Sequence, residues 1–485
     1  MESKTGCRLV FLEGSHSGLV RAPAKRLPCE SGVWSSNLHP SATKPEIPST
    51  KFEFQNKFTV VERKPMPQYH IWTIGCQMNK AESERLASYL ENRGYRAAPD
   101  AEYADLILVN SCVVRQSAEN RVINKLQVLK TLKRCHPQTS IALTGCLVGA
   151  DREKLKRSFP FVDYFFPAGD LPGWLGDHRA EEMLPQRPGA ATYVPIMQGC
   201  DNFCAYCVVP YRRGRERSRP LEEIVCEVKG LANRGVKEVT LLGQNVDSYG
   251  HDLADKPDLA DLLYRLDPIE GLCRIRFLTN HPKDMKSKLI DAVARLGKVC
   301  EQINLPVQAG DNAVLKAMRR GYTVEHYREL VAEIRARVPE ISLSTDVIVG
   351  FPGETDEQFQ NTYKLLSEIQ FDVVHVAAYS PRPETLAGRV MADDVPPGIK
   401  KERLEKIEHL QAKIAGDINA RLQDRVVEVL VEGKKKGKWT GRTRGDKLVF
   451  FSDKGGLQSC LVNIRITRTS PWSLSGELGL PERVI

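Results

Sequence analysis

The sequence has 485 residues and a formal net charge of +9, so we expect two or three domains and a mildly basic surface that is compatible with nucleic acid. Hydrophobic residues make up 41% of the chain, enough for packed cores, and no apolar run is long enough to cross a membrane. The thirteen cysteines, without a convincing secretory signal, favour a reducing compartment, and we expect a cytoplasmic protein.

Residues 1–66 show no sustained hydrophobic period and are rich in Ser, Pro, Gly and scattered charge. Such a segment buries too little apolar surface to offset the entropy lost on ordering, so we expect a disordered or dispensable extension. A transit peptide is the alternative, and Glu2, Glu13 and Glu30 count against it. Met66 precedes the first clear strand and is a candidate for the true start of the protein.

Residues 67–184 alternate short β-rich runs with helical patterns, which predicts a doubly wound α/β domain around a parallel sheet. The expected strands are 69–74, 106–109 and 141–143, and the expected helices are 79–93 and 117–133. Cys76, Cys112 and Cys146 each lie just past one of these strands. Because the carboxyl ends of parallel strands meet at one edge of a sheet, these three cysteines should converge in space.

We interpret this convergence as an iron–sulfur cluster site. The alternative is that each cysteine is only a small buried hydrophobe. That ordinary role is what we expect for Cys135, Cys226, Cys273 and Cys300.

A second group of cysteines, Cys200, Cys204 and Cys207, falls within eight residues in the spacing C-x-x-x-C-x-x-C. A cubane cluster normally takes four cysteines, and the next one, Cys226, lies in an expected helix. One iron would therefore lack a protein ligand and could bind and activate a small molecule. A zinc knot or a disulfide is the alternative, but structural zinc sites need four ligands and the loop has no histidine.

Residues 186–418, which follow a Pro/Gly-punctuated linker over 170–188, show six βα units. Such a series predicts a partial (βα)6 barrel with its site at the C-terminal ends of the strands. The expected strands are 194–197, 238–242, 274–278, 302–305, 342–349 and 373–378. Polar and glycine-containing segments follow these strands at 199–207, 243–245, 279–281, 306–310, 350–354 and 379–381.

Residues 420–483, after an expected charged helix over 401–421, contain several short strands with glycine turns, which predicts a small all-β barrel. A basic loop beside aromatic residues suits a phosphate backbone and stacked bases. A solvated surface hairpin is the alternative. The candidate RNA-binding residues are Lys434, Lys435, Lys436, Lys438, Trp439 and Arg442.

The loop at Cys200 resembles the signature of the radical S-adenosylmethionine (SAM) enzymes, in which the open iron chelates SAM. From about residue 67 onward the chain resembles the methylthiotransferases, and most of all the MiaB-type branch, which modifies isopentenyladenosine in tRNA. The matching motifs are CQMN at 76–79, NSC at 110–112, TGC at 144–146, GCDNFCAYCVVPYRRG at 199–214, GQNV at 243–246, LPVQ at 305–308 and DVIVGFPGET at 346–355. Residues 420–483 resemble a TRAM domain, an RNA-binding β-barrel.

The resemblance implies two 4Fe–4S clusters and SAM as cofactors. Cys200, Cys204 and Cys207 would hold the radical cluster, and Cys76, Cys112 and Cys146 would hold an auxiliary cluster that delivers sulfur. The implied reaction is methylthiolation of N6-isopentenyl (dimethylallyl) adenosine at adenine carbon 2, next to the tRNA anticodon, with a second SAM as methyl donor. The candidates for shaping the SAM pocket are Tyr206, Gln244, Asn245, Gln308, Gly350 and Glu354.

The implied partners are tRNA, an electron donor and a sulfur source, and we expect a monomer. Four arginines after the cysteine loop, Arg212, Arg213, Arg215 and Arg217, could contact RNA phosphates or be structural. Two alternatives stay open. One is a methylthiotransferase for threonylcarbamoyl-adenosine in tRNA or for a ribosomal-protein aspartate. The other is a non-catalytic RNA-binding iron–sulfur protein, against which the missing fourth cysteine of each triad argues.

Overall fold

The computed structural model describes residues 66–149, 152–170, 173, 184–185 and 188–479. Residues 1–65 and most of the expected linker over 170–188 lie outside the described residues. The expectations of a dispensable extension and of a start at Met66 therefore stay predictions.

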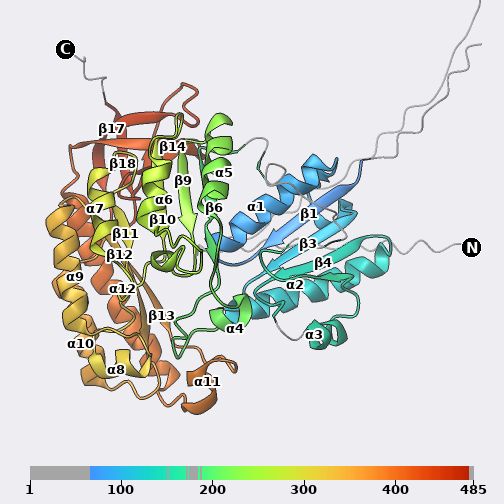
Figure 1. The fold of residues 1–485 in the computed structure, drawn as a ribbon, viewed down its shortest axis with the longest axis horizontal. Coiled ribbons are helices and arrows are strands. Elements are labelled where there is room, and N and C mark those ends of the chain that lie inside the picture. Colours follow the sequence, from blue (N-terminus) through green and yellow to red (C-terminus); the bar gives the residue numbers. More distant parts are fainter. Residues whose placement is uncertain (1–65, 150–151, 171–172, 174–183, 186–187, 480–485) are drawn as a thin grey trace, which may run out of the picture. The chain divides into compact units, whose positions relative to one another are not determined.

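The first domain is a five-stranded parallel sheet in the order β2-β1-β3-β4-β5, with helices on both faces (Figure 1). Leu106 and Leu108 of the central strand β3 pack in the same core as α1, whereas Ile107 and Val109 pack with α2. This alternation confirms the doubly wound prediction, because both faces of β3 are buried. The elements are β1 (Gln68–Thr73), α1 (Gln77–Asn92), β2 (Arg96–Ala97), β3 (Leu106–Ser111), α2 (Gln116–Cys135), β4 (Ser140–Gly145), α3 (Arg152–Ser158) and β5 (Tyr164–Phe165).

The second domain contains two parallel three-stranded sheets, β10-β9-β6 and β11-β12-β13, whose six strands follow one another in the expected order. A bridge between Ile275 and Val299 links the two sheets. The strands are β6 (Ala191–Pro195), β9 (Glu238–Leu242), β10 (Arg274–Leu278), β11 (Gln302–Asn304), β12 (Ser342–Val349) and β13 (Val373–Ala378).

Helices cover the outer side of these sheets (Figure 1). Several begin at side chains that accept a hydrogen bond from the first helical turn, as Asp258, Thr323 and Thr355 do. The helices are α4 (Val209–Arg213), α5 (Leu221–Asn233), α6 (Leu259–Leu266), α7 (Ser287–Arg295), α8 (Asn312–Ala317), α9 (Val324–Arg337), α10 (Asp356–Ile369), α11 (Leu386–Val390) and α12 (Pro397–Ala420).

The first barrel strand differs from the prediction. The expected strand over 194–197 is divided between β6 and a separate short strand, β7 (Met197–Gln198), which pairs with β8 (Arg217–Ser218) in an antiparallel ladder. This ladder closes the segment between Gln198 and Arg217 into one loop, and the cysteine loop lies inside it.

The third domain is the expected small barrel, closed in the order β14-β15-β16-β18-β17. Its last strand, β18, was not predicted, because Leu474–Leu478 is short and contains a glycine that weakens the strand pattern. The strands are β14 (Val426–Lys435), β15 (Lys438–Thr443), β16 (Leu448–Phe451), β17 (Leu461–Thr469) and β18 (Leu474–Leu478).

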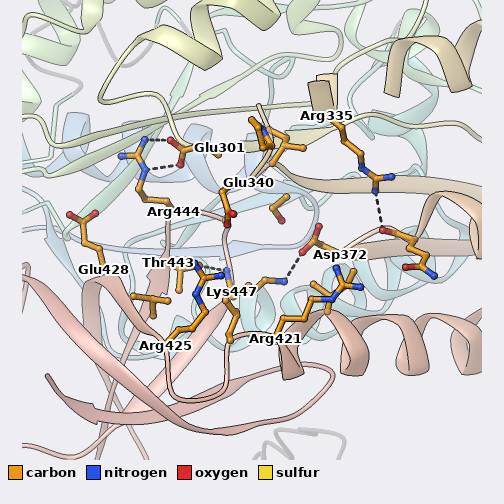
Figure 2. Close-up of a pocket in the computed structure, with 18 of the residues that line it drawn as sticks. Glu301, Arg335, Glu340, Asp372, Arg421, Arg425, Glu428, Thr443, Arg444 and Lys447 are labelled. Carbon is orange, nitrogen blue, oxygen red and sulfur yellow. Dashed lines mark hydrogen bonds and ion pairs between the residues drawn. The ribbon is translucent and has the colours of Figure 1, made fainter. Parts of the chain in front are cut away.

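The small barrel contacts the N-terminal ends of the larger barrel's strands. Arg274, the first residue of β10, is fully buried and donates to Glu428 and to the carbonyl of Arg442. Figure 2 shows two further pairs, Arg444 with Glu301 at 2.7 Å and Lys447 with Asp372 at 2.6 Å. The expected catalytic rim is at the opposite, C-terminal ends of these strands.

Candidate active site

The cysteine loop is held by backbone contacts at its start. Gly199 has φ +84°, and a Cβ there would lie 2.0 Å from the carbonyl oxygen of Arg215, so only glycine fits. Its N–H donates a 2.7 Å hydrogen bond to Oε1 of Gln244, in the turn after β9. The N–H of Cys200 donates to the carbonyl of Gly214. The loop is therefore fixed at the C-terminal rim of the barrel.

The three thiols of this loop lie close enough to influence one another. Burial raises the pKa of Cys200 to about 11 and that of Cys207 to about 12, and Cys204 contributes to both increases. Binding of iron by these thiols would therefore release protons. The structure thus brings the three predicted ligands together.

The first triad also converges, as predicted. Cys76 caps the N-terminus of α1, while Cys112 and Cys146 directly follow β3 and β4. The Cys76 thiol contributes to the raised pKa of Cys112, and Cys112 contributes to that of Cys146, whose pKa burial raises to about 11. Only Cys76 of the three is exposed.

Polar side chains of the motifs CQMN, NSC and TGC tie these strand ends together. Asn79 Nδ2 donates to Asn110 Oδ1 at 2.9 Å and to the carbonyl of Ser111 at 3.1 Å. Ser111 Oγ donates to the carbonyl of Thr144 and accepts the N–H of Leu147. These buried bonds explain why each cysteine is accompanied by asparagine, serine or threonine.

Among the described residues, no group of three or more His, Cys, Asp or Glu side chains could hold a single metal ion. Each triad supplies three cysteine thiols, the ligand type that a 4Fe–4S cluster takes. Of the cysteines expected to be buried hydrophobes, Cys300 is buried and Cys273 partly buried. That expectation was wrong for Cys135 and Cys226, which are exposed because they occupy solvent-facing helix positions.

One short helix links the two triads. Helix α4 begins two residues after Cys207 and ends at Arg213, whose Nε donates a 3.2 Å hydrogen bond to Sγ of Cys146. Five helical residues span only about 7 Å, so the two cysteine groups are near neighbours. Arg213 is buried and also pairs with Glu82 of α1 at 2.6 Å.

Arg213 is therefore not available to RNA phosphates. Of the two roles left open for it, the structural one applies, because the first domain covers a charge that would be exposed on an isolated loop. Three neighbouring arginines also form ion pairs, namely Arg212 with Glu384, Arg215 with Asp201 and Arg217 with Asp170. Arg215 and Arg217 keep most of their side chains exposed.

A cavity of about 650 Å³ lies inside the partial barrel, a size typical of small-ligand sites. Pro306 and Gln308 line it near the rim, and Trp472 of the small barrel lines its other end. Gln77, the neighbour of Cys76, also contributes to its wall. The cavity is therefore bordered by all three domains. A separate pocket of about 580 Å³ beside Arg444 and Lys447 contains none of the predicted site residues (Figure 2).

The candidate residues for the SAM pocket lie along the rim, but several already form hydrogen bonds to other protein groups. Glu354 Oε2 accepts from the N–H of Gly350 at 2.6 Å and from Arg403 at 2.7 Å. Asn245 Nδ2 donates to Asp284, and its buried Oδ1 has no hydrogen-bond partner among the described residues. Gln308 lines the cavity, and Tyr206 packs partly buried against the barrel core.

Two more buried polar atoms, Oδ1 of Asn280 and Nε2 of His281 in the loop after β10, have no hydrogen-bond partner in the described part of the chain. Burial and the nearby Arg320 lower the pKa of His281 to about 3, so its ring is neutral. Because Nδ1 accepts the N–H of Lys283, Nε2 carries the proton. Together with Oδ1 of Asn245, these atoms form an unsatisfied set of donors and acceptors that suits a polar ligand such as SAM.

The basic loop of the small barrel is exposed at Lys434, Lys435, Lys436 and Lys438, which suits either an RNA-binding loop or a solvated hairpin. Trp439 is different: it is only 6% exposed, packs in the barrel core and donates to the carbonyl of Asp453. Its ring is also covered by the Lys434 ammonium at 4.3 Å, so it is not free to stack on a base. The Trp439 side chain faces the interior of the small barrel on β15, and the basic residues around it in the sequence do not indicate this orientation.

Three residues that sequence reasoning missed lie at the site. Trp472 lines the cavity and is 61% exposed. The one feature of the sequence that could have indicated its role is a lone tryptophan in a Ser/Pro-rich turn. Gln77 was interpreted only as part of a motif. Arg320 donates to Cys204 Sγ at 3.4 Å from 116 positions away, and no local pattern predicts such a contact. Arg442 was a candidate, and it faces the cavity while pairing with Asp446.

Family models match three stretches of the chain, namely the Radical SAM superfamily over 194–366, the Uncharacterized protein family UPF0004 over 68–167 and the TRAM domain over 421–478. The tRNA-2-methylthio-N(6)-dimethylallyladenosine synthase of Dehalococcoides mccartyi is 59% identical over 413 residues, which is 85% of this chain and 99% of that protein. The chain belongs to the tRNA-2-methylthio-N(6)-dimethylallyladenosine synthases.

Another synthase of this family, from Chloroflexus aurantiacus, is 50% identical over 434 residues. The matched region is 86% of this chain and 92% of that protein. The solved structure of the radical S-adenosylmethionine methyltransferase TsrM from Kitasatospora setae matches with a TM-score of 0.50 at 15% identity, covering 67% of this chain and 74% of that chain, which shows a shared fold. Membership of this synthase family confirms that the protein is a radical SAM enzyme and confirms the expected cofactors, SAM and 4Fe–4S clusters. It overturns the non-catalytic alternative. No helix in the described ranges is long and apolar enough to span a membrane.

Proposed function

We propose that the protein adds a methylthio group to carbon 2 of N6-dimethylallyl (isopentenyl) adenosine next to the anticodon of tRNA. The observation that carries this proposal is the pairing of two cysteine triads across α4, through the hydrogen bond from Arg213 to Cys146. A reaction that must both activate an inert C–H bond and deliver sulfur needs two such centres side by side.

In this proposal Cys200, Cys204 and Cys207 hold the radical cluster, and Cys76, Cys112 and Cys146 hold the auxiliary cluster. Each triad leaves one iron of a cubane without a protein ligand. When bound and reduced, the radical cluster with SAM supplies a 5′-deoxyadenosyl radical, and the auxiliary cluster supplies sulfur. The partnerless atoms of Asn245, Asn280 and His281 would orient SAM at the rim.

The cavity inside the barrel would receive the modified adenine. Its wall joins Gln77, the neighbour of Cys76, with Gln308 of the rim, so a base in it would contact both the first domain and the barrel rim. Asp346 and His375 supply polar groups along the wall. The basic loop at Lys434 would hold phosphates outside the cavity.

We assign the reaction to three domains, 67–184 for the auxiliary cluster, 186–418 for the radical core and 420–483 for RNA binding, and we regard residues 1–66 as dispensable. We further propose a cytoplasmic monomer that receives electrons from a low-potential donor and sulfur from a separate source. The coarser conclusion, a tRNA-modifying synthase, rests on family membership.

The decisive experiment is nucleoside analysis of tRNA treated with the anaerobically reconstituted protein, SAM, dithionite and sulfide. Two matched substrates are supplied, one carrying dimethylallyladenosine and one carrying threonylcarbamoyl-adenosine. We expect a methylthio product from the first alone. Product from the second alone would assign the protein to the other tRNA branch. No product from either, with both clusters loaded, would contradict the proposal.

A further inference from the structure

Each cysteine triad has one buried arginine that donates to a cysteine sulfur. Arg213 Nε lies 3.2 Å from Cys146 Sγ, and Arg320 Nη1 lies 3.4 Å from Cys204 Sγ. Both arginines are almost fully covered, with exposed fractions of 7% and 4%. The two sites are therefore alike in the donor they present to sulfur.

The charges of the two arginines are balanced differently. Arg213 forms a two-pronged ion pair with Glu82, through Nη1 at 2.6 Å and Nη2 at 3.3 Å. Glu82 comes from α1, the helix that Cys76 caps, and is itself largely buried. The arginine and the carboxylate together bring no net charge to the Cys146 site.

Arg320 has only neutral partners in the part of the chain that the structure describes. Nη2 donates to the carbonyl of Pro306 at 3.0 Å, and Nε donates to the hydroxyl of Tyr322 at 3.1 Å. Its remaining hydrogen bond among the described residues is the one from Nη1 to the Cys204 thiol. Nearby His281 is neutral, and Asp284 beyond it is paired with Lys283.

A buried cation without a counter-ion is costly, and the partner that would balance it is an anionic group bound by the adjacent thiolates. One-electron reduction makes an iron–sulfur cluster more negative. A cation close to it stabilises the reduced form, and hydrogen bonds to its sulfurs act in the same direction. Arg320 supplies both effects, whereas Arg213 with Glu82 supplies only the hydrogen bond.

We propose that Arg320 raises the reduction potential of the cluster on Cys200, Cys204 and Cys207 above that of the cluster on Cys76, Cys112 and Cys146. A low-potential one-electron donor, losing one electron, would then reduce the radical centre first. Glu82 keeps the other cluster at the lower potential by neutralising Arg213. This inference rests on the cluster assignment under the proposed function.

The test measures the potential of each cluster alone in the full-length chain, by redox titration followed by electron paramagnetic resonance. Triple alanine substitution of Cys76, Cys112 and Cys146 isolates the radical cluster, and the reciprocal triple substitution isolates the other. Arg320→Met should lower the reduced-to-oxidised ratio of the radical cluster at least tenfold at a fixed solution potential, which is about 59 mV for a one-electron couple. Arg320→Lys, which keeps the charge, should shift it less.

Glu82→Gln is the reciprocal test, because it leaves the Arg213 charge unbalanced. It should raise the potential of the auxiliary cluster and leave that of the radical cluster unchanged. If Arg320→Met does not retain its cluster, Arg320→Gln replaces it as a neutral residue that can still donate to sulfur.

Iron analysis distinguishes a failure of this inference from a failure of the proposed function. A triad that binds no iron contradicts the cluster assignment and hence the proposed function. Loaded clusters with potentials unmoved by both the neutral Arg320 variant and Glu82→Gln overturn the inference alone. A radical-cluster potential at or below that of the auxiliary cluster in otherwise unaltered protein overturns the ordering.

Discussion

The backbone N–H of Gly199 donates a 2.7 Å hydrogen bond to the side-chain oxygen of Gln244. This bond connects the residue before the first loop cysteine to the residue that ends the GQ turn after β9. The glycine is required here for two reasons, its positive φ and the carbonyl of Arg215 that faces it. The contact makes the position of the cysteine loop depend on the barrel rim.

Replacing Gly199 with alanine should displace the loop and remove about half of the iron, because the new Cβ meets backbone that cannot give way. Gly94→Ala is the matched control. Gly94 has φ +83°, nearly the same as Gly199, but its Cβ would point into open space. Both variants carry a backbone strain of roughly 1–2 kcal/mol, so equal iron loss would show that strain alone, rather than the contact, is responsible. Iron content and thermal unfolding measure the two effects.

Two cubane clusters imply about eight irons per chain after anaerobic reconstitution. Cys200→Ala and Cys76→Ala should each remove about half of that amount, since each disrupts one triad. Cys226→Ala should remove none, because Cys226 is an exposed residue of α5. A triad variant with undiminished iron would exclude that triad as a cluster site.

The two triads should differ in the product that depends on them. Cys112→Ala should still form 5′-deoxyadenosine with dithionite and SAM, because the rim and the cysteine loop belong to one domain, but it should form no methylthio-adenosine. Cys204→Ala should form neither. Both products are quantified in one anaerobic reaction with dimethylallyl-tRNA. Methylthiolation by Cys112→Ala at the unaltered rate would remove sulfur delivery from the first domain.

Neutralising Lys434, Lys435, Lys436 and Lys438 together should weaken tRNA binding and reduce its salt dependence. In a plot of the logarithm of the binding constant against the logarithm of the salt concentration, the slope should become shallower by roughly 0.7–0.9 for each phosphate contact that is lost. SAM cleavage without RNA should not change, since these exposed lysines lie on the small barrel. The control neutralises Lys401, Lys406 and Lys413, which are exposed on α12. tRNA-binding titrations at two salt concentrations measure this effect. A salt dependence of binding that is unchanged in the loop variant would exclude this loop from the RNA surface.

Much of the fold could be predicted, because its signals are local or periodic. Strand β3 begins with a continuous apolar run over 106–109, β12 ends with one over 347–349, and helices such as α5 carry a stripe of buried residues. The small barrel was expected from short strands and glycine turns, although β18 was missed. Trp439 shows the limit of composition, because a basic neighbourhood does not reveal which face of a strand turns inward.

The sequence by itself determined that three thiols share one loop, that three others end neighbouring strands, and that both sets lie where parallel strands place ligands. Residue spacing and the alternation of strands with helices are sufficient for these predictions, because residues close in sequence stay close in space. Only the tertiary structure decided which side chains surround the thiols. Arg213 meets Glu82 across 131 positions, and Arg320 meets Cys204 across 116. Such contacts arise because packed domains exclude water and force buried charges to find partners, and no short-range pattern records which partner that is.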